Sequence, residues 1–339
     1  MYELVEPGKP QPYRGLNQIH QSRFGHVFES TLITSSDENN NRASARPIRR
    51  IAVLGAGTMG HGIAQVAAAA GYTVVLHDVS AEALARGRQS IEKNLAKGIQ
   101  LGKLTELDRD ETLKRIRDTT ELTDIRDADL VVEAAPEILD LKQSLLRDAE
   151  ALIAGDCIFA TNTSSLSITE ISAASTRPAN VVGLHFFNPV HLMRLVEIVT
   201  GAQTSEATTA TVREVATRMK KEPITVRDVP GFASSRLGVT LGLEAMRMLE
   251  QGVASARDID TAMELGYNHP MGPLRLTDLV GLDVRLKIAE YLHGKLGSET
   301  FRPPEILRRM VGEGKLGKKS GEGFYNWNEP EPAQKAYTT

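Results

Sequence analysis

The chain has 339 residues, of which 41% are hydrophobic, and its formal net charge is −3. That length can bury one large or two medium-sized hydrophobic cores. The nearly balanced charge gives no general case for binding nucleic acid or an anionic membrane, and no apolar run approaches the roughly 18–20 residues of a membrane span. The only cysteine, Cys157, excludes an intrachain disulfide, nothing resembles a set of zinc ligands, and we expect this thiol to be a small core residue.

The first 47 residues differ in composition from the rest of the chain. They are rich in Gln, Ser, Asn, Pro and Arg and show no periodicity, which predicts a mostly disordered extension or a misassigned start site. The opening MYELVEPGKP lacks the basic and then apolar pattern of a secretory signal, and the acids among these residues argue against a transit peptide. We therefore expect a cytoplasmic protein.

A glycine-rich turn follows the first strongly apolar run, Ile51 to Leu54. Its GxGxxG spacing allows a tight turn at the first glycine, close approach of a pyrophosphate at the second, and close packing of helix on strand at the third. The segment HGIAQVAAAAG after it has helical composition, and a helix N-terminus offers unpaired N–H groups to phosphates. The predicted cofactor-binding turn consists of Gly55, Ala56, Gly57, Thr58, Met59 and Gly60.

A second apolar run, YTVVLHD, ends in Asp78, 23 residues after Gly55. A carboxylate at this place accepts the hydroxyls of an adenosine ribose. Its charge would repel a 2′-phosphate, and Val79, Ser80 and Ala81 offer no arginine to hold one. The pattern therefore predicts a dinucleotide site that prefers NAD to NADP.

Strand and helix patterns alternate after Asp78. A polar helix over 80–104 precedes strand-like runs that end near Glu133, in CIFATN, in NVVGLHFFNP, in MRLVEIV and in EPITVRD, whereas only helical patterns follow Pro230. This order predicts an α/β protein, a Rossmann-type doubly wound sheet of parallel strands with crossover helices, followed by an all-helical C-terminal domain. We place the dinucleotide-binding domain at 48–229, the helical domain at 230–328 and a tail at 329–339.

The stretch GLHFFNPVHLMRLVEIV contains a histidine and an acid on two successive strands, His185 and Glu197. A strand-end imidazole with a carboxylate in reach makes a general base, because the acid orients the ring and stabilises its protonated form. Such a pair is in general more often an ordinary buried polar contact. The motifs around it decide between these interpretations.

The motifs GAGTMGHGIA, NTSSLSI, GLHFFNPVHLMRLVEIV, VPGF, HPMGPLRLTDLVGLD and GKKSGEGFY occur in this order over residues 48–328. With them the chain resembles the 3-hydroxyacyl-CoA dehydrogenase family, and its monofunctional 3-hydroxybutyryl-CoA members look most similar. The resemblance implies NAD-dependent oxidation of a 3-hydroxyacyl-CoA to the 3-ketoacyl-CoA, or the reverse, on a short acyl chain in fatty acid metabolism. It also implies a homodimer formed through the helical domain, and no metal.

The resemblance also implies roles for single residues. His185 would be the catalytic base with Glu197 as its partner, and Ser164 would hold the substrate hydroxyl near the nicotinamide. The residues expected to contact NAD or line its cleft are Asn188, Glu137, Lys142 and, from the helical domain, Lys319. Plainer roles are open: Glu137 and Lys142 as a solvated helix face, Ser164 as the cap of a helix starting at Ser167, and Asn188 as a turn residue.

Some positions depart from the family pattern. Ser235 stands where the family has an asparagine that helps to position the substrate, and a serine could reach it only through water. His191 and Arg194 replace a proline and a lysine. The CoA-contacting serine and lysine of some relatives fall at Asn94 and Leu101, so Lys93, Lys97 and Lys103 are alternative candidates for the CoA phosphates.

Two rival functions remain beside this interpretation. The first is a dehydrogenase of a free 3-hydroxy acid or a carnitine-like substrate, because the departures put the acyl-CoA assignment in doubt. The second is a catalytically silent NAD-binding structural protein. The presence of His185, Glu197 and Ser164 together argues against the second, because a silent protein has no need of all three.

Overall fold

The computed structural model describes residues 47–329, and the expected N-terminal extension and C-terminal tail lie almost entirely outside this range. Its sheet has eight strands in the order β3-β2-β1-β4-β5-β6-β7-β8. Their bounds are β1 Arg50–Leu54, β2 Thr73–His77, β3 Ile116–Thr119, β4 Leu130–Glu133, β5 Ile158–Thr161, β6 Val181–Phe186, β7 Leu195–Thr200 and β8 Glu222–Arg227. The five pairs from β3 to β6 are all parallel, and the chain reverses direction across the sheet between β1 and β4. This order is that of a doubly wound dinucleotide-binding sheet, which confirms the predicted fold class.

One pair of strands departs from the expected parallel sheet. β6 and β7 are antiparallel, whereas β7 and β8 are parallel again. Only residues 187–194 connect β6 to β7, and a parallel connection needs a crossover of a dozen or more residues. The short connection therefore makes a hairpin, and the hairpin places two side chains of the site opposite each other.

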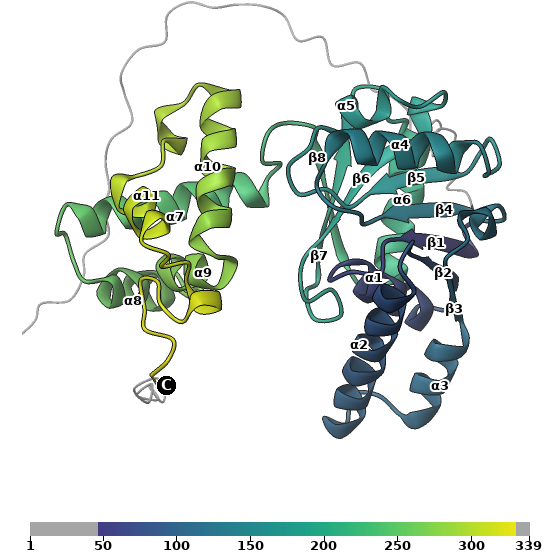
Figure 1. Cartoon of the computed structure of the whole chain (residues 1–339), viewed down its shortest axis with the longest axis horizontal. Coiled ribbons are helices and arrows are strands. Elements are labelled where there is room, and N and C mark those ends of the chain that lie inside the picture. The colour runs from purple at the N-terminus through teal and green to yellow at the C-terminus, as the bar shows by residue number, and fades with distance from the viewer. Residues whose placement is uncertain (1–46, 330–339) are drawn as a thin grey trace, which may run out of the picture. The chain divides into compact units, whose positions relative to one another are not determined.

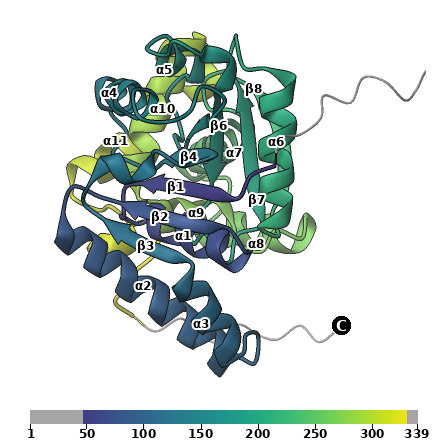
Figure 2. The ribbon, with the colours of Figure 1, turned by 90° about the vertical axis from the view of Figure 1, so that its right-hand side faces the viewer.

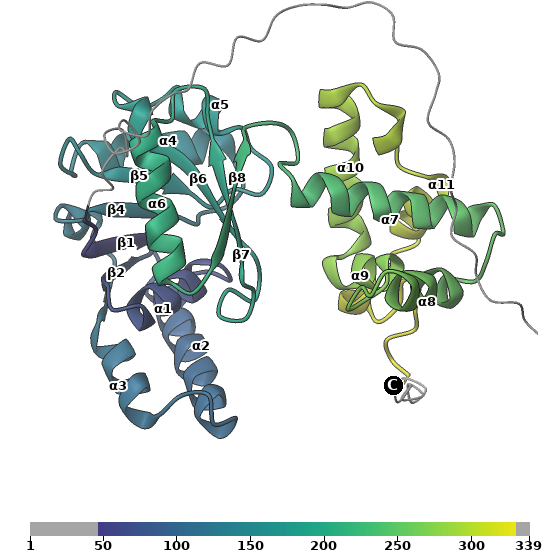
Figure 3. The same ribbon diagram turned by 180° about the vertical axis from the view of Figure 1, so that it is seen from behind.

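Helices cover both faces of the sheet. The helices of this part are α1 Gly60–Ala69, α2 Ala81–Gln100, α3 Glu106–Lys114, α4 Leu139–Glu150, α5 Ile168–Ser172 and α6 Glu206–Arg218. In Figure 1, α4 and α5 lie in front of the sheet, and Figure 3 shows α6 on the opposite face. Side chains of a strand point alternately to the two faces, so Ile51 and Val53 join one core cluster while Ala52 and Leu54 join the other.

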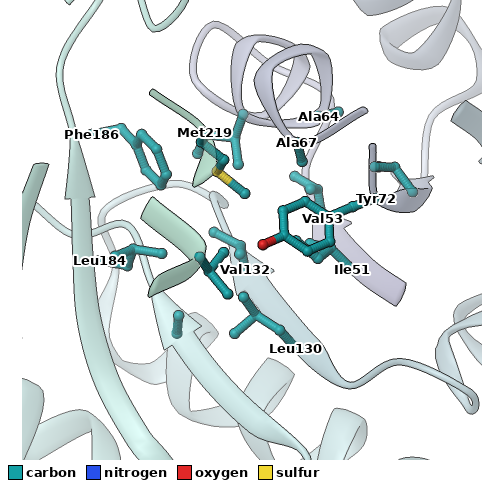
Figure 4. Packing of buried hydrophobic residues seen from close by; sticks show 14 of the residues in the cluster. Ile51, Val53, Ala64, Ala67, Tyr72, Leu130, Val132, Leu184, Phe186 and Met219 are labelled. Atoms are coloured by element: carbon teal, nitrogen blue, oxygen red, sulfur yellow. The ribbon is translucent and has the colours of Figure 1, made fainter. Parts of the chain in front are cut away.

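The first cluster packs α1 and α6 against the sheet. Figure 4 shows Ala64 and Ala67 of α1 and Met219, just after α6, around Val53 and Val132. These side chains are almost fully buried, and burying a valine, leucine or isoleucine stabilises the fold by about 1.5–3 kcal/mol. Cys157 is 2% exposed in the second cluster, which agrees with a core position.

The polar helix predicted over 80–104 ends four residues earlier than expected. α2 begins after Ser80, whose hydroxyl accepts the N–H of Ala83, and it ends at Gln100. A separate helix, α3, then starts from Thr105 with a complete capping box. Figures 1 and 2 show α2 and α3 extending together beyond the β3 edge of the sheet. The sequence pattern did not predict α3 or β3.

From Ser234 to the end of the described range the named elements are all helices. They are α7 Ser234–Glu250, α8 Ala256–Gly266, α9 Pro273–Val280, α10 Leu282–Leu296 and α11 Glu305–Gly312, with short 3-10 turns at Glu299–Phe301 and Lys318–Ser320. They share a third core cluster that includes Val239, Leu274 and Leu307. None of the described helices combines the length and the apolar character that a membrane crossing requires.

The end of the motif GKKSGEGFY packs against a buried acid of α9. Asp278 of α9 is completely buried and accepts the backbone N–H groups of Phe324 and Tyr325 and the indole N–H of Trp327 at 2.8–2.9 Å. A Cβ atom on Gly323 would lie 2.2 Å from Oδ1 of Asp278. The glycine after GE in this motif is therefore required by the packing of the chain on itself.

Candidate active site

The glycine turn lies where the strand order reverses, at the carboxyl end of β1. Gly55 has φ +99° and donates its N–H to the carbonyl of His77 at 2.7 Å. A Cβ atom at Gly55 would lie 2.8 Å from the carbonyl oxygen of Ala134, and one at Gly60 would lie 1.7 Å from that of Gly55. A Cβ atom at Gly57 would meet nothing within 4 Å. Two of the glycines are thus required by packing, and the third leaves an open surface.

The residues present here fit a dinucleotide. The N-terminus of α1 has no capping side chain and no acid in its first turn, so its N–H groups and positive dipole are available to a pyrophosphate. Asp78 lies beside the turn, where its Oδ2 accepts the N–H of Ala56 at 2.8 Å and its Oδ1 accepts that of Ser80 at 3.0 Å. Val79 is 86% exposed. The acid that we expect to bind the ribose therefore also supports the glycine turn.

His185 and Glu197 lie directly opposite each other in the antiparallel register of β6 and β7. Opposite residues of an antiparallel pair point to the same face of the sheet, and Nδ1 of His185 is 2.9 Å from Oε2 of Glu197. His185 is 7% exposed and Glu197 is completely buried. A carboxylate can only accept a hydrogen bond, so it keeps the imidazole proton on Nδ1 and the lone pair of the neutral ring on Nε2.

The carboxylate of Glu197 is held by three further donors. Its Oε1 accepts the N–H groups of Ala233 at 3.2 Å and Ser234 at 2.8 Å, and its Oε2 accepts the hydroxyl of Ser234 at 2.9 Å. Burial acts to raise the pKa of Glu197, but the hydrogen bonds from His185 and Ser234 outweigh it and hold this pKa below its ordinary value. Glu197 is therefore charged at neutral pH and able to stabilise an imidazolium.

Two aromatic rings lie close to the imidazole. The ring of Phe187 is 4.5 Å from that of His185 between centroids, and the ring of Phe232 is 6.0 Å away. Phe232 is 3% exposed and has φ +48°, a left-handed conformation that is rare for a bulky residue. Backbone strain of this kind persists where the surroundings impose it and is concentrated at functional sites. Together the two rings limit how the imidazole can tilt.

Glu137 organises the turn that contains Ser164. Its Oε1 accepts the hydroxyl of Thr163 at 2.5 Å and the N–H groups of Ser164 and Ser165 at 2.9 and 3.0 Å. Burial tends to raise the pKa of Glu137, but the Thr163 hydroxyl and the nearby Lys142 ammonium lower it below its usual range. Glu137 precedes α4 and is therefore not part of a helix face, although its side chain is 34% exposed.

Lys142 was expected either to line the NAD cleft or to lie on a solvated helix face, and its environment fits neither role. Its side chain is completely buried, and its Nζ lies 2.8 Å from Oε1 of Glu133 and 3.5 Å from Oε2 of Glu137. A fully buried ammonium neither lines an open cleft nor belongs to a solvated face. The structure instead pairs Lys142 with the completely buried carboxylate of Glu133. Burial could not be read from a helix pattern with charges on it.

Ser164 lies in the turn after β5, and β5 pairs with β6, the strand that contains His185. We refer to His185 and Glu197 together as the dyad. Oδ1 of Asn162 accepts the N–H of Phe186 at 2.8 Å, which joins this turn to the residue after His185. Ser164 is exposed, and its hydroxyl lies 3.3 Å from Oε1 of Glu137. The cap of α5 is Ser167 itself, which accepts the N–H of Glu170, so the alternative of Ser164 as that cap is wrong.

The remaining predicted residues lie in several places. Asn188 is exposed in the connection between β6 and β7, and Ser235 is half-buried in the first turn of α7. Nζ of Lys319 is 2.5 Å from Oδ1 of Asp283 in the helical domain. Their contacts with a cofactor or substrate stay predictions.

Sequence reasoning missed Ser234 and Phe232 as neighbours of the dyad. Both belong to the VPGFASSRL segment, in which the family pattern singles out Ser235 because an asparagine falls there. The signal that could have found Ser234 is its position. It is the first residue of a helix that starts three residues after Gly231, which has positive φ. At the start of a helix, a hydroxyl and an N–H can reach the same acceptor.

Comparisons with known proteins identify the family of the chain. Residues 50–229 match the model of the 3-hydroxyacyl-CoA dehydrogenase NAD-binding domain, and residues 231–327 match that of the 3-hydroxyacyl-CoA dehydrogenase C-terminal domain. A probable 3-hydroxybutyryl-CoA dehydrogenase of Deinococcus radiodurans is 49% identical over 279 residues, which cover 82% of this chain and 100% of that protein. The human mitochondrial hydroxyacyl-coenzyme A dehydrogenase is 41% identical over 311 residues, covering 89% of this chain and 99% of that protein.

A solved structure shows the same architecture. The (S)-3-hydroxybutyryl-CoA dehydrogenase of Ralstonia eutropha superposes with a TM-score of 0.81 at 41% identity, covering 84% of this chain and 100% of that one. Family models match almost every residue that the structure describes, and the relatives match along nearly their full length. The chain therefore belongs to the 3-hydroxyacyl-CoA dehydrogenase family and is an NAD-dependent oxidoreductase that acts on 3-hydroxyacyl-CoA.

Proposed function

We propose that the chain oxidises a short 3-hydroxyacyl-CoA, such as 3-hydroxybutyryl-CoA, or reduces the corresponding 3-ketoacyl-CoA, with His185 and Glu197 as its acid–base pair. The observation that carries the proposal is the 2.9 Å contact between Nδ1 and Oε2 across β6 and β7. It leaves the lone pair of Nε2 available for the proton of a substrate hydroxyl. The short acyl chain is supported by the bacterial relatives, which are named as 3-hydroxybutyryl-CoA dehydrogenases.

The chain's own residues would move the proton and hold the substrate. Bound NAD supplies the hydride acceptor. Nε2 of His185 removes the proton of the 3-hydroxyl, and the negative charge of Glu197 stabilises the imidazolium that forms. The hydroxyl of Ser164 donates to the substrate oxygen and holds it while its charge grows. In the reduction, His185 begins protonated and returns the proton to that oxygen.

The proposed CoA contact lies on α2. Lys93, Lys97 and Lys103 are exposed on α2 and the turn after it, whereas Asn94 donates its amide to Oε1 of Gln65 at 3.1 Å. Lysine ammonium groups are strong point charges for phosphates. We propose that these lysines, and not Asn94 or Leu101, attract the phosphates of CoA.

The test is a set of steady-state assays with the whole chain. The wild-type protein is measured with acetoacetyl-CoA, longer 3-ketoacyl-CoAs and free 3-hydroxy acids, each with NADH and with NADPH. We expect the highest kcat/KM with acetoacetyl-CoA and NADH. His185→Gln should lower kcat by about 10²–10⁴-fold, the usual worth of a positioned acid–base, with NADH affinity unchanged. Near-normal turnover of His185→Gln, or a preference for free acids, would contradict the proposal.

We also propose a homodimer formed through the helical domain, in the cytoplasm. Support comes from large apolar side chains that are 38–75% exposed on α7, α9 and α10 and around the end of α8: Leu237, Leu265, Tyr267, Leu276, Leu279, Val280 and Val284. A gathering of exposed apolar residues of this kind is typical of an interaction surface. Light scattering should give twice the chain mass, and Leu237→Lys with Val284→Lys should give a monomer.

A further inference from the structure

The first helix of the helical region has its N-terminus on the carboxylate of Glu197. α7 begins at Ser234, and its N-cap residue, Ala233, has no side chain that can cap it. The acceptor comes from β7 instead. Glu197 Oε1 takes the N–H groups of Ala233 and Ser234 at 3.2 and 2.8 Å. An anion at this place is stabilised by the unpaired N–H groups and by the helix dipole.

The hydroxyl of Ser234 contacts the same oxygen as the imidazole does. It donates to Oε2 at 2.9 Å, and Nδ1 of His185 lies 2.9 Å from that oxygen. A carboxylate oxygen that accepts two hydrogen bonds shares its charge between them. Each donor also lowers the proton affinity of the carboxylate, which agrees with the lowered pKa of Glu197.

Ser235, unlike Ser234, makes no hydrogen bond to Glu197. It follows Ser234 in the same helical turn and is half-buried, and within the described residues no hydrogen bond engages its hydroxyl. The two adjacent serines therefore provide a matched pair of positions, since only one of the hydroxyls touches the proposed dyad.

From this arrangement we propose that Ser234 is a positioning residue of the dehydrogenase, which acts through Glu197 on the basicity of His185. The inference rests on the acid–base role proposed above for that pair. By donating to Oε2, the hydroxyl fixes the carboxylate in the plane that faces Nδ1. It also withdraws charge that would otherwise stabilise the imidazolium. Ser234 thus keeps the base neutral, and ready to accept a proton, down to a lower pH than an isolated His–Glu pair would.

The experiment is a pH profile of kcat/KM for the oxidation of 3-hydroxybutyryl-CoA with NAD, for the wild type, Ser234→Ala and Ser235→Ala. Removing the Ser234 hydroxyl should move the acidic limb to higher pH by about 0.5–1 unit, since one hydrogen bond contributes about 0.5–1.5 kcal/mol and one pH unit corresponds to 1.36 kcal/mol. Ser235→Ala should change KM and leave the limb in place. A merely structural role of Ser234 would lower kcat/KM at all pH values without moving the limb.

Two more variants keep the test decisive if Ser234→Ala does not fold. Ser234→Thr retains the donor and should restore the wild-type limb, and Ser234→Cys, with a weaker donor, should shift it part of the way in the same direction. An unmoved limb in Ser234→Ala and Ser234→Cys, or an equal shift in Ser235→Ala, would overturn the inference.

A measurement without turnover separates this inference from the proposed function. The His185 ring is titrated by NMR in the wild type and in Ser234→Ala, with His185→Gln to assign the signal. The ring should titrate at higher pH without the Ser234 hydroxyl, even if His185→Gln were to keep its activity. An unchanged titration would overturn the role of Ser234, while an active His185→Gln would overturn only the acid–base assignment.

Discussion

A Cβ atom at Gly60 would lie 1.7 Å from the carbonyl oxygen of Gly55, because the first turn of α1 is packed on the end of β1. The glycine between them is different, since a Cβ atom at Gly57 would meet nothing within 4 Å. One glycine of the turn therefore serves the fold, and the other leaves room for a ligand.

The two glycines should separate folding from cofactor binding. We expect Gly60→Ala to cost more than about 3 kcal/mol of unfolding free energy, beyond ordinary overpacking, because backbone must move. Gly57→Ala should change it by less than about 1 kcal/mol but weaken NADH binding, because a methyl group would stand where the pyrophosphate approaches. Urea unfolding and fluorescence titration with NADH measure the two effects. Tight NADH binding by Gly57→Ala would contradict the assignment of the turn.

Glu197→Gln should change both the kinetics and the pH dependence of stability. Without the carboxylate the imidazolium is less stabilised, so the acidic limb of kcat/KM should move to lower pH. The folded protein also holds the pKa of Glu197 below its ordinary 4.5. A depressed carboxyl pKa stabilises the fold above that value, and the contribution is lost as the pH falls through the lower, folded pKa. As the pH falls below about 5, the unfolding free energy of Glu197→Gln should therefore decrease less than that of the wild type. Urea unfolding at each pH measures this difference.

Asp78→Ser with Val79→Arg should narrow or invert the preference for NADH over NADPH. The substitution removes the charge that repels a 2′-phosphate and adds a cation at a position that is 86% exposed. Because Oδ2 of Asp78 also accepts the N–H of Ala56, the variant should lose some affinity for both cofactors. Asp78→Asn is the control for that loss. Equal use of NADH and NADPH by the unmodified protein would contradict this assignment of Asp78.

Lys142→Met should be strongly destabilising, because it leaves the carboxylate of Glu133 buried without a counter-ion. Breaking a buried pair in this way costs about 3–5 kcal/mol. Adding Glu133→Gln should recover part of that loss. The matched control is Arg308→Met, which removes a surface pair with Glu290 whose side chains are 43% and 46% exposed, and which should cost less than about 1 kcal/mol. Similar losses in thermal unfolding for both single variants would show that the buried pair matters no more than the surface pair.

Ser235 tests the substrate side of the site. If it contacts substrate, Ser235→Ala should cost about 0.5–1.5 kcal/mol of transition-state stabilisation, the usual net worth of one hydrogen bond. Ser235→Asn adds an amide donor, so activity with a short 3-ketoacyl-CoA should hold or rise. Steady-state kinetics of the two variants measure both effects. A silent Ser235→Ala together with a damaged Ser235→Asn would mean that the site is built around serine and that the short-chain assignment loses support.

Much of the fold was predictable from local patterns. The glycine turn, the acid 23 residues later and the loss of strand patterns after Pro230 together predicted a doubly wound sheet followed by helices, and the structure has this order. Local patterns failed at α3, where a run of charged residues hides a helix held by its capping box. They also failed at the antiparallel pairing of β6 and β7, which depends on the length of a connection and on the pairing of whole strands.

The motifs named the residues of the site and paired His185 with Glu197, but they did not show how these side chains contact each other. His185 and Glu197 are 12 residues apart, and that separation alone does not say that they face each other. The hairpin register decides it, because it pairs them directly. The burial of Lys142 could not be predicted from the sequence either, because a lysine on a helix with a polar pattern is usually solvated. Only the packing shows that its ammonium is buried between Glu133 and Glu137.

By itself, the sequence determined the features that depend on residue type and spacing. Glycine spacing allowed the phosphate-binding turn, an acid at the end of the second strand favoured NAD, and the order of motifs placed the chain in its family. The tertiary structure decided which groups lose water and which donors they find in exchange. It buried Lys142 and Glu133 together, set Asp78 on the glycine turn and brought the hydroxyl of Ser234 to Glu197. Solvation and hydrogen-bond partners depend on residues distant in the chain, and local sequence does not contain that information.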